Sequence, residues 1–306
     1  MKLFTNQNYN DPEKRRVEVV ERKGVGHPDT LADALAEECS RVYSKKCLEQ
    51  FGFVLHHNID KVYVGAGLFE NTIGSYEKKY PIKVRLNGRV SNSYAGINID
   101  LDTLFKNVIK EYLGCVMPHL DVENDVDINI NCTQFSKLDN WYAPKSVVDL
   151  PEEKQLLAND TSSVTAFYPF SICEKLALEL EKSFWSPNEK LYPIPKYSEV
   201  GQDIKVMVSR VDSKITVFIS MPVICTAIKN EDEYYKITKK HRERTQKLAD
   251  QICALSSYTV EVLVNHTVDD ELKKSGHLYL LAKGTCAECG EEGTVGRFRR
   301  RNRCYS

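Results

Sequence analysis

The sequence lacks a surplus of charge of either sign. Its 306 residues include 42 Lys and Arg against 43 Asp and Glu, which gives a formal net charge of −1. Disordered chains combine low hydrophobicity with high net charge, and general DNA-binding proteins need an excess of basic residues. With 42% hydrophobic residues, the chain has neither property. We therefore expect a soluble globular protein holding about two domains' worth of residues, with no nucleic-acid partner.

Long hydrophobic runs are also missing. No window approaches the roughly 18–20 apolar residues that span a bilayer, and Met1–Glu13 is polar with no apolar leader. The ten cysteines are scattered along the chain instead of framing a small domain, as is typical of reduced intracellular thiols. These features predict a cytoplasmic protein without a disulfide scaffold and without a membrane partner.

Two familiar ligand motifs are incomplete. Gly65-Ala66-Gly67 lacks the third glycine and the following helix of a dinucleotide-binding fingerprint, so we exclude a Rossmann fold. Cys286-Ala287-Glu288-Cys289 has no second CxxC or close His pair, and a structural zinc ion needs four ligands. Metal binding through these thiols is therefore not favoured.

Hydrophobic periodicity predicts an internal repeat. The order helix, two strands, helix, strand occurs twice, over about Thr30–Asn131 and Ser171–His266. A last strand near His277–Lys283 leads into a glycine-punctuated loop, Gly284–Arg297. The expected helices are Thr30–Glu49, Leu101–Tyr112 (stopped at Gly114), Ser171–Trp185 and Glu231–Leu255, and the expected strands are Lys61–Val64, Ile82–Val90, Val126–Ile130, Ile204–Arg210, Lys214–Ile224 and Val260–Val264.

One segment, Gly24-Val25-Gly26-His27-Pro28-Asp29, stands where a helix is expected to begin. Free backbone N–H groups and the helix dipole favour an anion there, and His27 could donate a proton to it. Phosphate is the natural ligand. The alternative is a tight turn in which Asp29 caps the helix and His27 is exposed.

Three further segments have both a functional and a structural interpretation. Lys205 lies on a strand next to Asp203, either as a phosphate clamp or as a solvated lysine. The small polar residues of Leu157–Ser162 suit a loop that approaches a ligand, or simply a turn. The basic run Arg297–Arg303 could follow nucleic-acid phosphates, but a solvated terminal run or an out-of-frame remnant is favoured.

Together, four motifs in this order resemble the archaeal-type S-adenosylmethionine synthetases. They are Val19–Thr30, Leu157–Ser162, Gly201–Met207 and Gly284–Arg297, and His56–Asp60 also fits. The resemblance extends from about Val17 to Arg297.

The resemblance implies an α+β fold of three pseudo-symmetric repeats, in which helices pack on mixed or antiparallel sheets, and two repeats would be largely present here. We expect the first at 22–131, the second at 160–282, and the active-site loop with a remnant of the third at 283–306. It also implies an active site shared across a sheet-to-sheet interface, either in a homodimer or with another synthetase subunit or fragment.

The implied reaction joins ATP and L-methionine to give S-adenosylmethionine, phosphate and pyrophosphate, with Mg²⁺ and K⁺. A leaving triphosphate needs fixed cations and metal ions. By motif match, the catalytic residues would be His27, Lys205 and Arg297, with Arg297 gripping the polyphosphate. Nucleotide-binding residues would be Asp203, Asn159 and Asp160. Metal ligands would be Asp29 and Glu291, and at the position of Glu291 the family usually has Asp.

The family pattern continues beyond Arg297 with segments that this sequence does not contain. Two hypotheses follow. The chain is a methionine adenosyltransferase, acting alone or complemented by another fragment, or it is an inactive truncated paralogue that binds nucleotide or pairs with a complete subunit. A nucleic-acid binder using the arginine-rich tail ranks last.

Overall fold

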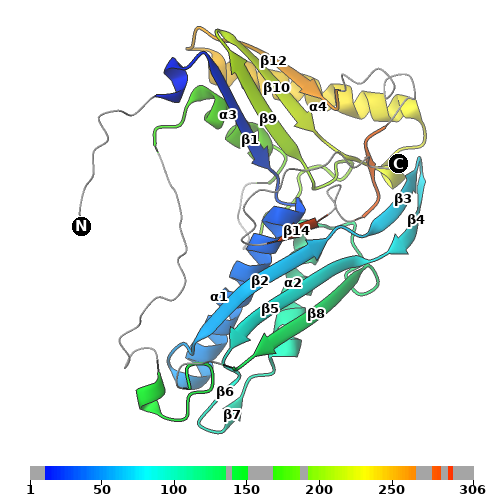
Figure 1. The fold of residues 1–306 in the computed structure, drawn as a ribbon. Helices are drawn as coiled ribbons and strands as arrows, with labels where there is room; N and C mark the ends of the chain where they lie inside the picture. The colour runs from blue at the N-terminus through cyan, green and yellow to red at the C-terminus, as the bar shows by residue number, and fades with distance from the viewer. Residues whose placement is uncertain are drawn as a thin grey trace.

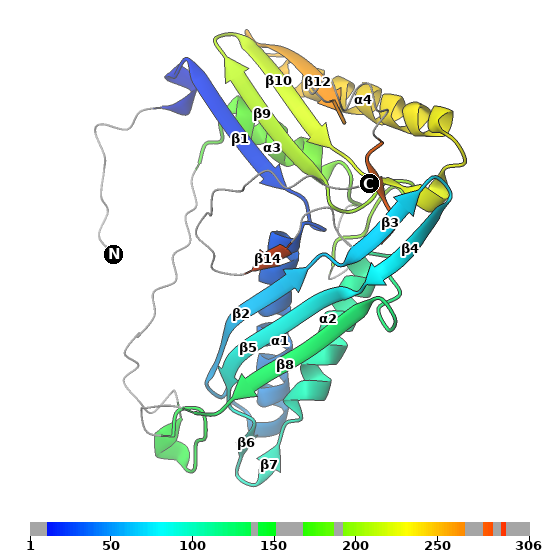
Figure 2. The same cartoon turned by 45° about the vertical axis from the view of Figure 1, so that its right-hand side comes forward.

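The computed structural model of the chain describes residues 11–135, 140–150, 168–186, 192–266 and 278–283, together with the backbone of 289–291. The described part consists of two layers, each a four-stranded sheet with a pair of helices on one face. Figures 1 and 2 show the two sheets one above the other, with the strands on one side and the helices on the other. The predicted α+β class is confirmed.

The first sheet has the strand order β14-β2-β5-β8. β2 pairs antiparallel with β5, and β5 pairs parallel with β8 through the crossover helix α2. Alternate side chains of β2 and β5 point toward α1 and are buried there, which is why these strands read as alternating apolar and polar residues. The elements are α1 (Pro28–Phe51), β2 (His57–Gly65), β5 (Ile82–Val90), α2 (Leu101–Val116), β8 (Val126–Thr133) and β14 (Cys289–Glu291).

The second sheet repeats this topology with the order β1-β9-β10-β12. β9 pairs antiparallel with β10, and β10 pairs parallel with β12 through the crossover helix α4. The elements are β1 (Val17–Lys23), α3 (Ile172–Lys182), β9 (Lys205–Val211), β10 (Lys214–Ser220), α4 (Glu231–Cys253) and β12 (Thr259–Val264). The residue boundaries that we assigned to the repeats stay a prediction.

The two layers exchange their edge strands. β1 precedes the first layer in the chain but pairs with β9 of the second sheet, and β14 follows the second layer but pairs with β2 of the first. The chain therefore crosses between the layers directly after β1, at the glycine-rich segment before α1. The glycine-rich segment Gly24–His27 therefore lies where the chain passes from the second sheet to the first.

Smaller elements join the layers. They are the hairpins β3 (Leu68–Thr72) with β4 (Ser75–Tyr80) and β6 (Ser93–Tyr94) with β7 (Ile97–Asn98), the parallel pair β11 (Val223–Ile224) and β13 (Leu280–Leu281), and the 3₁₀ turns Pro12–Lys14, Val147–Asp149 and Cys225–Ala227.

Two predicted element ends are wrong. The expected stop at Gly114 does not occur, because α2 continues to Val116 and thereby buries both Leu113 and Val116. The expected long strand Lys214–Ile224 ends at Ser220, since Met221 and Pro222 interrupt the ladder and proline has no N–H to donate.

A side chain from α4 closes the outer edge of β12. The amide of Gln246 donates to the carbonyl of Val260 at 3.0 Å and accepts from the backbone N–H of Val262 at 2.8 Å. An uncovered edge strand offers such groups to other chains. Gln246 therefore occupies the backbone groups that would otherwise accept another strand.

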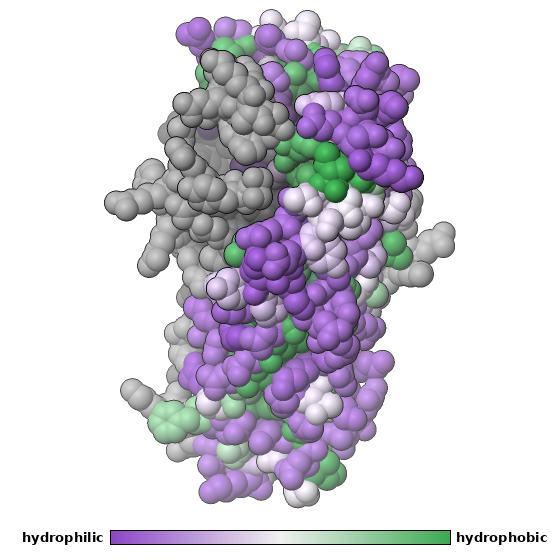
Figure 3. All heavy atoms as spheres, turned by 90° about the vertical axis from the view of Figure 1, so that its right-hand side faces the viewer, coloured by the Kyte–Doolittle hydropathy of each residue, from purple (hydrophilic) through white to green (hydrophobic). Residues whose placement is uncertain are grey.

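The side of the molecule shown in Figure 3 is mostly hydrophilic, and its hydrophobic residues gather most clearly in a patch in the upper half and in a narrower stripe below. Among the described residues, no helix has the length and apolar character needed to cross a bilayer.

His241 is a fully buried histidine on α4. Its ring stacks on Phe184 with centroids 5.7 Å apart and meets Tyr197 edge-on at 4.7 Å, while Nε2 lies 3.4 Å from Oε1 of Glu199. Burial and then the positive charge of Arg244 lower the pKa of His241 to about 4, against an opposing effect of Glu199. The ring is therefore neutral in the folded protein at neutral pH.

We expect this histidine to make the protein less stable in mild acid. In the unfolded chain the His241 pKa returns to its ordinary value near 6.5, so the unfolded state takes up a proton first as the pH falls. This linkage removes about 2 kcal/mol of unfolding free energy between pH 7.5 and pH 5. Urea unfolding of the parent and His241→Gln at both pH values measures the effect as the difference between their pH slopes. Equal slopes would contradict it.

Candidate active site

Two glycines bind the predicted anion-binding segment to the motif Gly201–Met207, just before β9 begins. The backbone N–H of Gly24 donates to the carbonyl of Ile204 at 2.7 Å, and that of Gly26 donates to Gln202 at 3.1 Å. A Cβ atom at Gly24 would lie 2.5 Å from the Ile204 oxygen, and one at Gly26 would lie 2.5 Å from the backbone carbon of Gln202. Glycine is thus required at both positions. These contacts bring the segments 24–29 and 202–205 side by side.

His27 begins helix α1. Its Nδ1 accepts a hydrogen bond from the backbone N–H of Asp29 at 3.1 Å, so His27 is the N-cap residue and Pro28 takes the first helical position. The alternative in which Asp29 caps the helix and His27 is exposed is wrong, because His27 is 1% exposed. With Nδ1 accepting, the proton of a neutral ring sits on Nε2, and this nitrogen is the hydrogen-bond donor.

Charged side chains surround this helix start. The ammonium group of Lys23 donates to Oδ2 of Asp29, and Nζ of Lys205 lies 3.8 Å from Oε1 of Glu21. Lys23 and Lys205 are direct partners across the β1–β9 ladder. Lys205 and Asp29 were expected from the sequence, whereas Lys23 was not. Its position opposite Lys205 depends on strand pairing, which the sequence does not display.

Asp203 precedes β9 and is buried, as is its neighbour Gln202. The amide of Gln202 donates to the carbonyl of Val200 at 3.0 Å. A buried carboxylate beside the helix start places a second acidic group, besides Asp29, in this region.

A cavity of about 390 Å³ lies between β1 and α3 and is lined by Glu21 and Lys23 of this charged group. Its volume falls in the range of small-molecule sites. Glu21, Arg22 and Lys23 line one side of it, and α3 supplies Glu174 and Ala177 on the other. Arg22 is itself anchored, because its Nε donates to Glu181 at 2.8 Å.

The strand that carries Glu291 also reaches this region. In β14 the backbone of Glu291 lies opposite Tyr63 of β2, and the strand packs against α1. Figures 1 and 2 show β14 close to the end at which α1 begins. Nothing is described of the Glu291 side chain, so its assignment as a metal ligand stays a prediction. Outside the described residues lie Asn159, Asp160, Arg297 and Cys286, while Cys289 is described in its backbone alone.

A further carboxylate, Asp33, lies near the helix start. Asp33 lies one turn after Asp29, and its pKa is raised, chiefly by burial and then by the negative charge of Asp29. Within the described ranges, no three His, Cys, Asp or Glu side chains gather in a group that could hold a metal ion. Asp29 nevertheless offers hard carboxylate oxygens, and Mg²⁺ is commonly held by one or two carboxylates plus substrate phosphates.

His57, in the segment His56–Asp60, links α1 to β2. Its Nε2 lies 2.7 Å from Oγ of Ser40 and its Nδ1 lies 3.1 Å from the carbonyl of Leu55, which requires a proton on Nδ1. Burial lowers the pKa of His57. This residue therefore acts in the described structure as a neutral connector between helix and strand.

Residues 3–305 match the family model of the S-adenosylmethionine synthetases (AdoMet synthetases), and the chain belongs to this family. The predicted resemblance is confirmed. S-adenosylmethionine synthases of Methanothermobacter marburgensis and Pyrococcus furiosus are 35% and 36% identical over 291 residues, which is 95% of this chain and 69% of each relative.

An uncharacterised protein of Streptococcus pyogenes serotype M3 is 36% identical over 298 residues, covering 97% of this chain and 71% of that protein. Among solved structures, an unusual S-adenosylmethionine synthetase from Campylobacter jejuni aligns with a TM-score of 0.43 at 15% identity, covering 90% of this chain and 62% of that chain. The chain thus spans about two thirds of the length of the relatives that it matches.

Proposed function

We propose that the protein forms S-adenosylmethionine from ATP and L-methionine, with release of phosphate and pyrophosphate. The observation that carries this proposal is the pair of glycine contacts, which join the His27 segment to the Lys205 segment. A proton donor, two lysines and two aspartates are thereby gathered where one helix begins. Family membership and the synthase relatives support the same reaction.

The reaction displaces the triphosphate of ATP, so negative charge develops on the leaving oxygen. In the proposed mechanism, Nε2 of His27 donates a hydrogen bond to that oxygen, because Nδ1 is already an acceptor. Lys205 holds the phosphate chain and Asp203 contacts the nucleoside. Arg297, Asn159 and Asp160 would complete the polyphosphate and nucleotide contacts.

Asp29 and Glu291 would hold Mg²⁺, which when bound neutralises charge on the phosphates. Asp29 lies in the first turn of α1, where the helix dipole stabilises a negative carboxylate. Its carboxylate oxygens are of the hard kind that Mg²⁺ prefers as ligands. A requirement for K⁺ is proposed from the family, without assigned ligands.

We further propose that the open face of the second sheet packs against another synthetase subunit, in a homodimer or a heteromer. Val17, Val19 and Val211 are exposed on the face opposite α3 and α4. Exposed apolar residues gathered on one sheet face are typical of an interaction surface.

The test is a direct assay of the purified chain with ATP, methionine, Mg²⁺ and K⁺, measuring S-adenosylmethionine and phosphate together. We expect product from the parent chain and a loss of roughly 10²–10³-fold in turnover for Lys205→Ala, because a cation facing the leaving group is removed. Lys214→Ala, an exposed lysine at the start of β10, is the matched control and should keep the parental rate.

The same preparation is examined by circular dichroism and sedimentation, so that folding and assembly are known. A folded chain that makes no product would contradict the enzymatic proposal. Nucleotide binding without turnover would then favour the alternative of a non-catalytic partner of a complete synthetase subunit.

A further inference from the structure

Two lysines face each other across neighbouring strands at the start of α1. Lys23 of β1 and Lys205 of β9 are directly opposite in the antiparallel ladder, so both side chains project from the same face of the sheet. Like charges directly opposite each other destabilise a sheet. Such a pair needs negative charge close by, and two carboxylates of the chain supply it.

Each lysine is neutralised by one carboxylate of the chain. Lys23 bonds to Asp29, and Lys205 lies 3.8 Å from Glu21. The side chains of Lys23 and Lys205 are 35% and 29% exposed, so both are partly accessible to a ligand. The cavity along β1 is lined by both Glu21 and Lys23. Lys205 is the direct partner of Lys23 on the neighbouring strand, so a polyanion that contacts Lys23 on this face of the sheet also lies next to Lys205.

We propose that Lys23 is a second cationic ligand of the substrate polyphosphate, acting with Lys205 as a clamp on adjacent phosphates. This inference rests on the proposed function and adds a residue to it. Opposite Cβ atoms in an antiparallel pair lie about 4.5–5.5 Å apart, and flexible lysine side chains of that spacing reach neighbouring phosphates.

The contact between Lys23 and Asp29 links this clamp to the metal ligand. Asp29 accepts a hydrogen bond from the ammonium group of Lys23. If Asp29 held a divalent cation, as proposed above, its carboxylate would no longer be the partner of Lys23, and the ammonium group of Lys23 would be available to a phosphate. Asp29 and the polyphosphate therefore compete for one lysine, and this competition can be measured without turnover.

The experiment titrates the full chain with inorganic tripolyphosphate by calorimetry, with and without Mg²⁺. We expect Lys23→Met and Lys205→Met each to weaken binding about tenfold or more, since a charge-assisted hydrogen bond is lost. Lys23→Arg should stay within about threefold of the parent, because it keeps the charge. Lys61→Met, an exposed lysine of β2, is the control and should bind like the parent.

The variant Asp29→Asn distinguishes phosphate binding by Lys23 from a purely structural role. If Lys23 were only structural, removing the Asp29 charge would change tripolyphosphate affinity equally with and without Lys23. Removing the competing carboxylate should tighten metal-free tripolyphosphate binding severalfold in the parent and by clearly less in the Lys23→Met background. Parental affinity in Lys23→Met, or Lys23→Arg as weak as Lys23→Met, overturns the proposal. So does a folded parent chain that does not bind tripolyphosphate.

The synthesis assay run in parallel separates the two ideas. If tripolyphosphate binding depends on Lys23 in a chain that makes no S-adenosylmethionine, the role of Lys23 is supported and the proposed reaction is overturned. Synthesis that is unaffected by Lys23→Met, together with unchanged tripolyphosphate binding, would do the reverse.

Discussion

Replacing Gly26 with alanine is expected to separate the two halves of the candidate site and to destabilise the fold. An alanine Cβ would lie 2.5 Å from the backbone carbon and 2.6 Å from the oxygen of Gln202. The obstacle is main chain, so no side-chain rotation relieves it. The segment must move away and lose the hydrogen bond from Gly26 to Gln202.

We expect a loss of about 2–4 kcal/mol in unfolding free energy, the sum of local overpacking and one buried hydrogen bond. Because the movement displaces His27 from Asp203 and Lys205, synthesis of S-adenosylmethionine should fall by more than the loss of folded protein explains. Urea unfolding gives the first quantity, and initial rates under conditions where the variant is fully folded give the second.

Gly114→Ala is the matched control. Gly114 lies in α2, and its added Cβ would have an ordinary contact of 3.8 Å with Val122. Alanine is preferred over glycine within a helix by about 0.5–1 kcal/mol, so this variant should be as stable as the parent or more so. Unfolding of Gly26→Ala at the parental urea concentration, together with a parental rate of synthesis, would contradict this prediction.

The sequence predicted the parts of the fold that depend on local periodicity. α1, α2, α4 and the strands β5 and β9 were expected within a few residues of their observed ends. These elements bury one face, and burial imposes a period that a single sequence displays. Their positions also gave the order of elements in each layer.

The exchanged edge strands could not be predicted in the same way. Neither β1 nor β14 was expected, and each pairs with a strand far away in the chain. Strand pairing is decided by tertiary structure, so no local pattern in the sequence indicates that Lys23 lies opposite Lys205. The family motifs did name His27, Asp29, Asp203 and Lys205 as site residues, and the structure brings them close together through Gly24 and Gly26.

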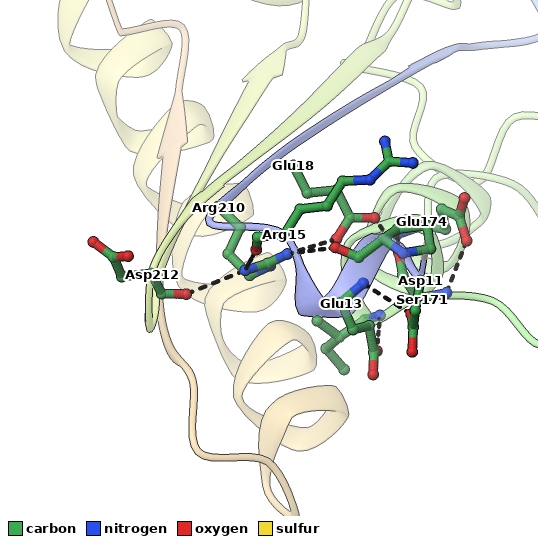
Figure 4. Close-up of polar contacts among 10 residues, drawn as sticks. Asp11, Glu13, Arg15, Glu18, Ser171, Glu174, Arg210 and Asp212 are labelled. Atoms are coloured by element: carbon green, nitrogen blue, oxygen red, sulfur yellow. Dashed lines mark hydrogen bonds and ion pairs between the residues drawn. The ribbon is translucent and has the colours of Figure 1, made fainter. Parts of the chain in front are cut away.

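Replacing Arg210 with methionine should have the largest effect of any substitution away from the candidate active site. Figure 4 shows Arg210 of β9 pointing toward Glu18 of β1 and the turn before it. The side chains are 2% and 7% exposed, with Nη2 of Arg210 3.3 Å from Oε2 of Glu18. The hydroxyl of Ser171 donates to the other carboxylate oxygen.

Arg210 also holds the N-terminal turn by its backbone. Its guanidinium donates to the carbonyls of Pro12 and Arg15, both at 2.9 Å, and to that of Asp212 at 3.3 Å. Methionine removes these donors and leaves the carboxylate of Glu18 buried without a counter-charge. Breaking a buried pair in this way costs about 3–5 kcal/mol.

Arg85→Met provides the comparison on the other sheet. Arg85 pairs with Asp127, but both side chains are at least one-third exposed, and such surface pairs contribute about 0–1 kcal/mol. Urea unfolding of both variants, with m-values compared, measures the difference. Limited proteolysis should also cut near the turn at Pro12 in Arg210→Met before it does so in the parent.

The double variant Glu18→Gln with Arg210→Met tests the cause. If the loss comes from an uncompensated buried charge, removing that charge should recover part of the stability, and the double variant will be less destabilised than the sum of the single ones. If the losses simply add, or if Arg210→Met costs no more than Arg85→Met, the pair is not what fastens the N-terminal turn. The backbone pairing of β1 with β9 would then hold that turn without help from the buried charges.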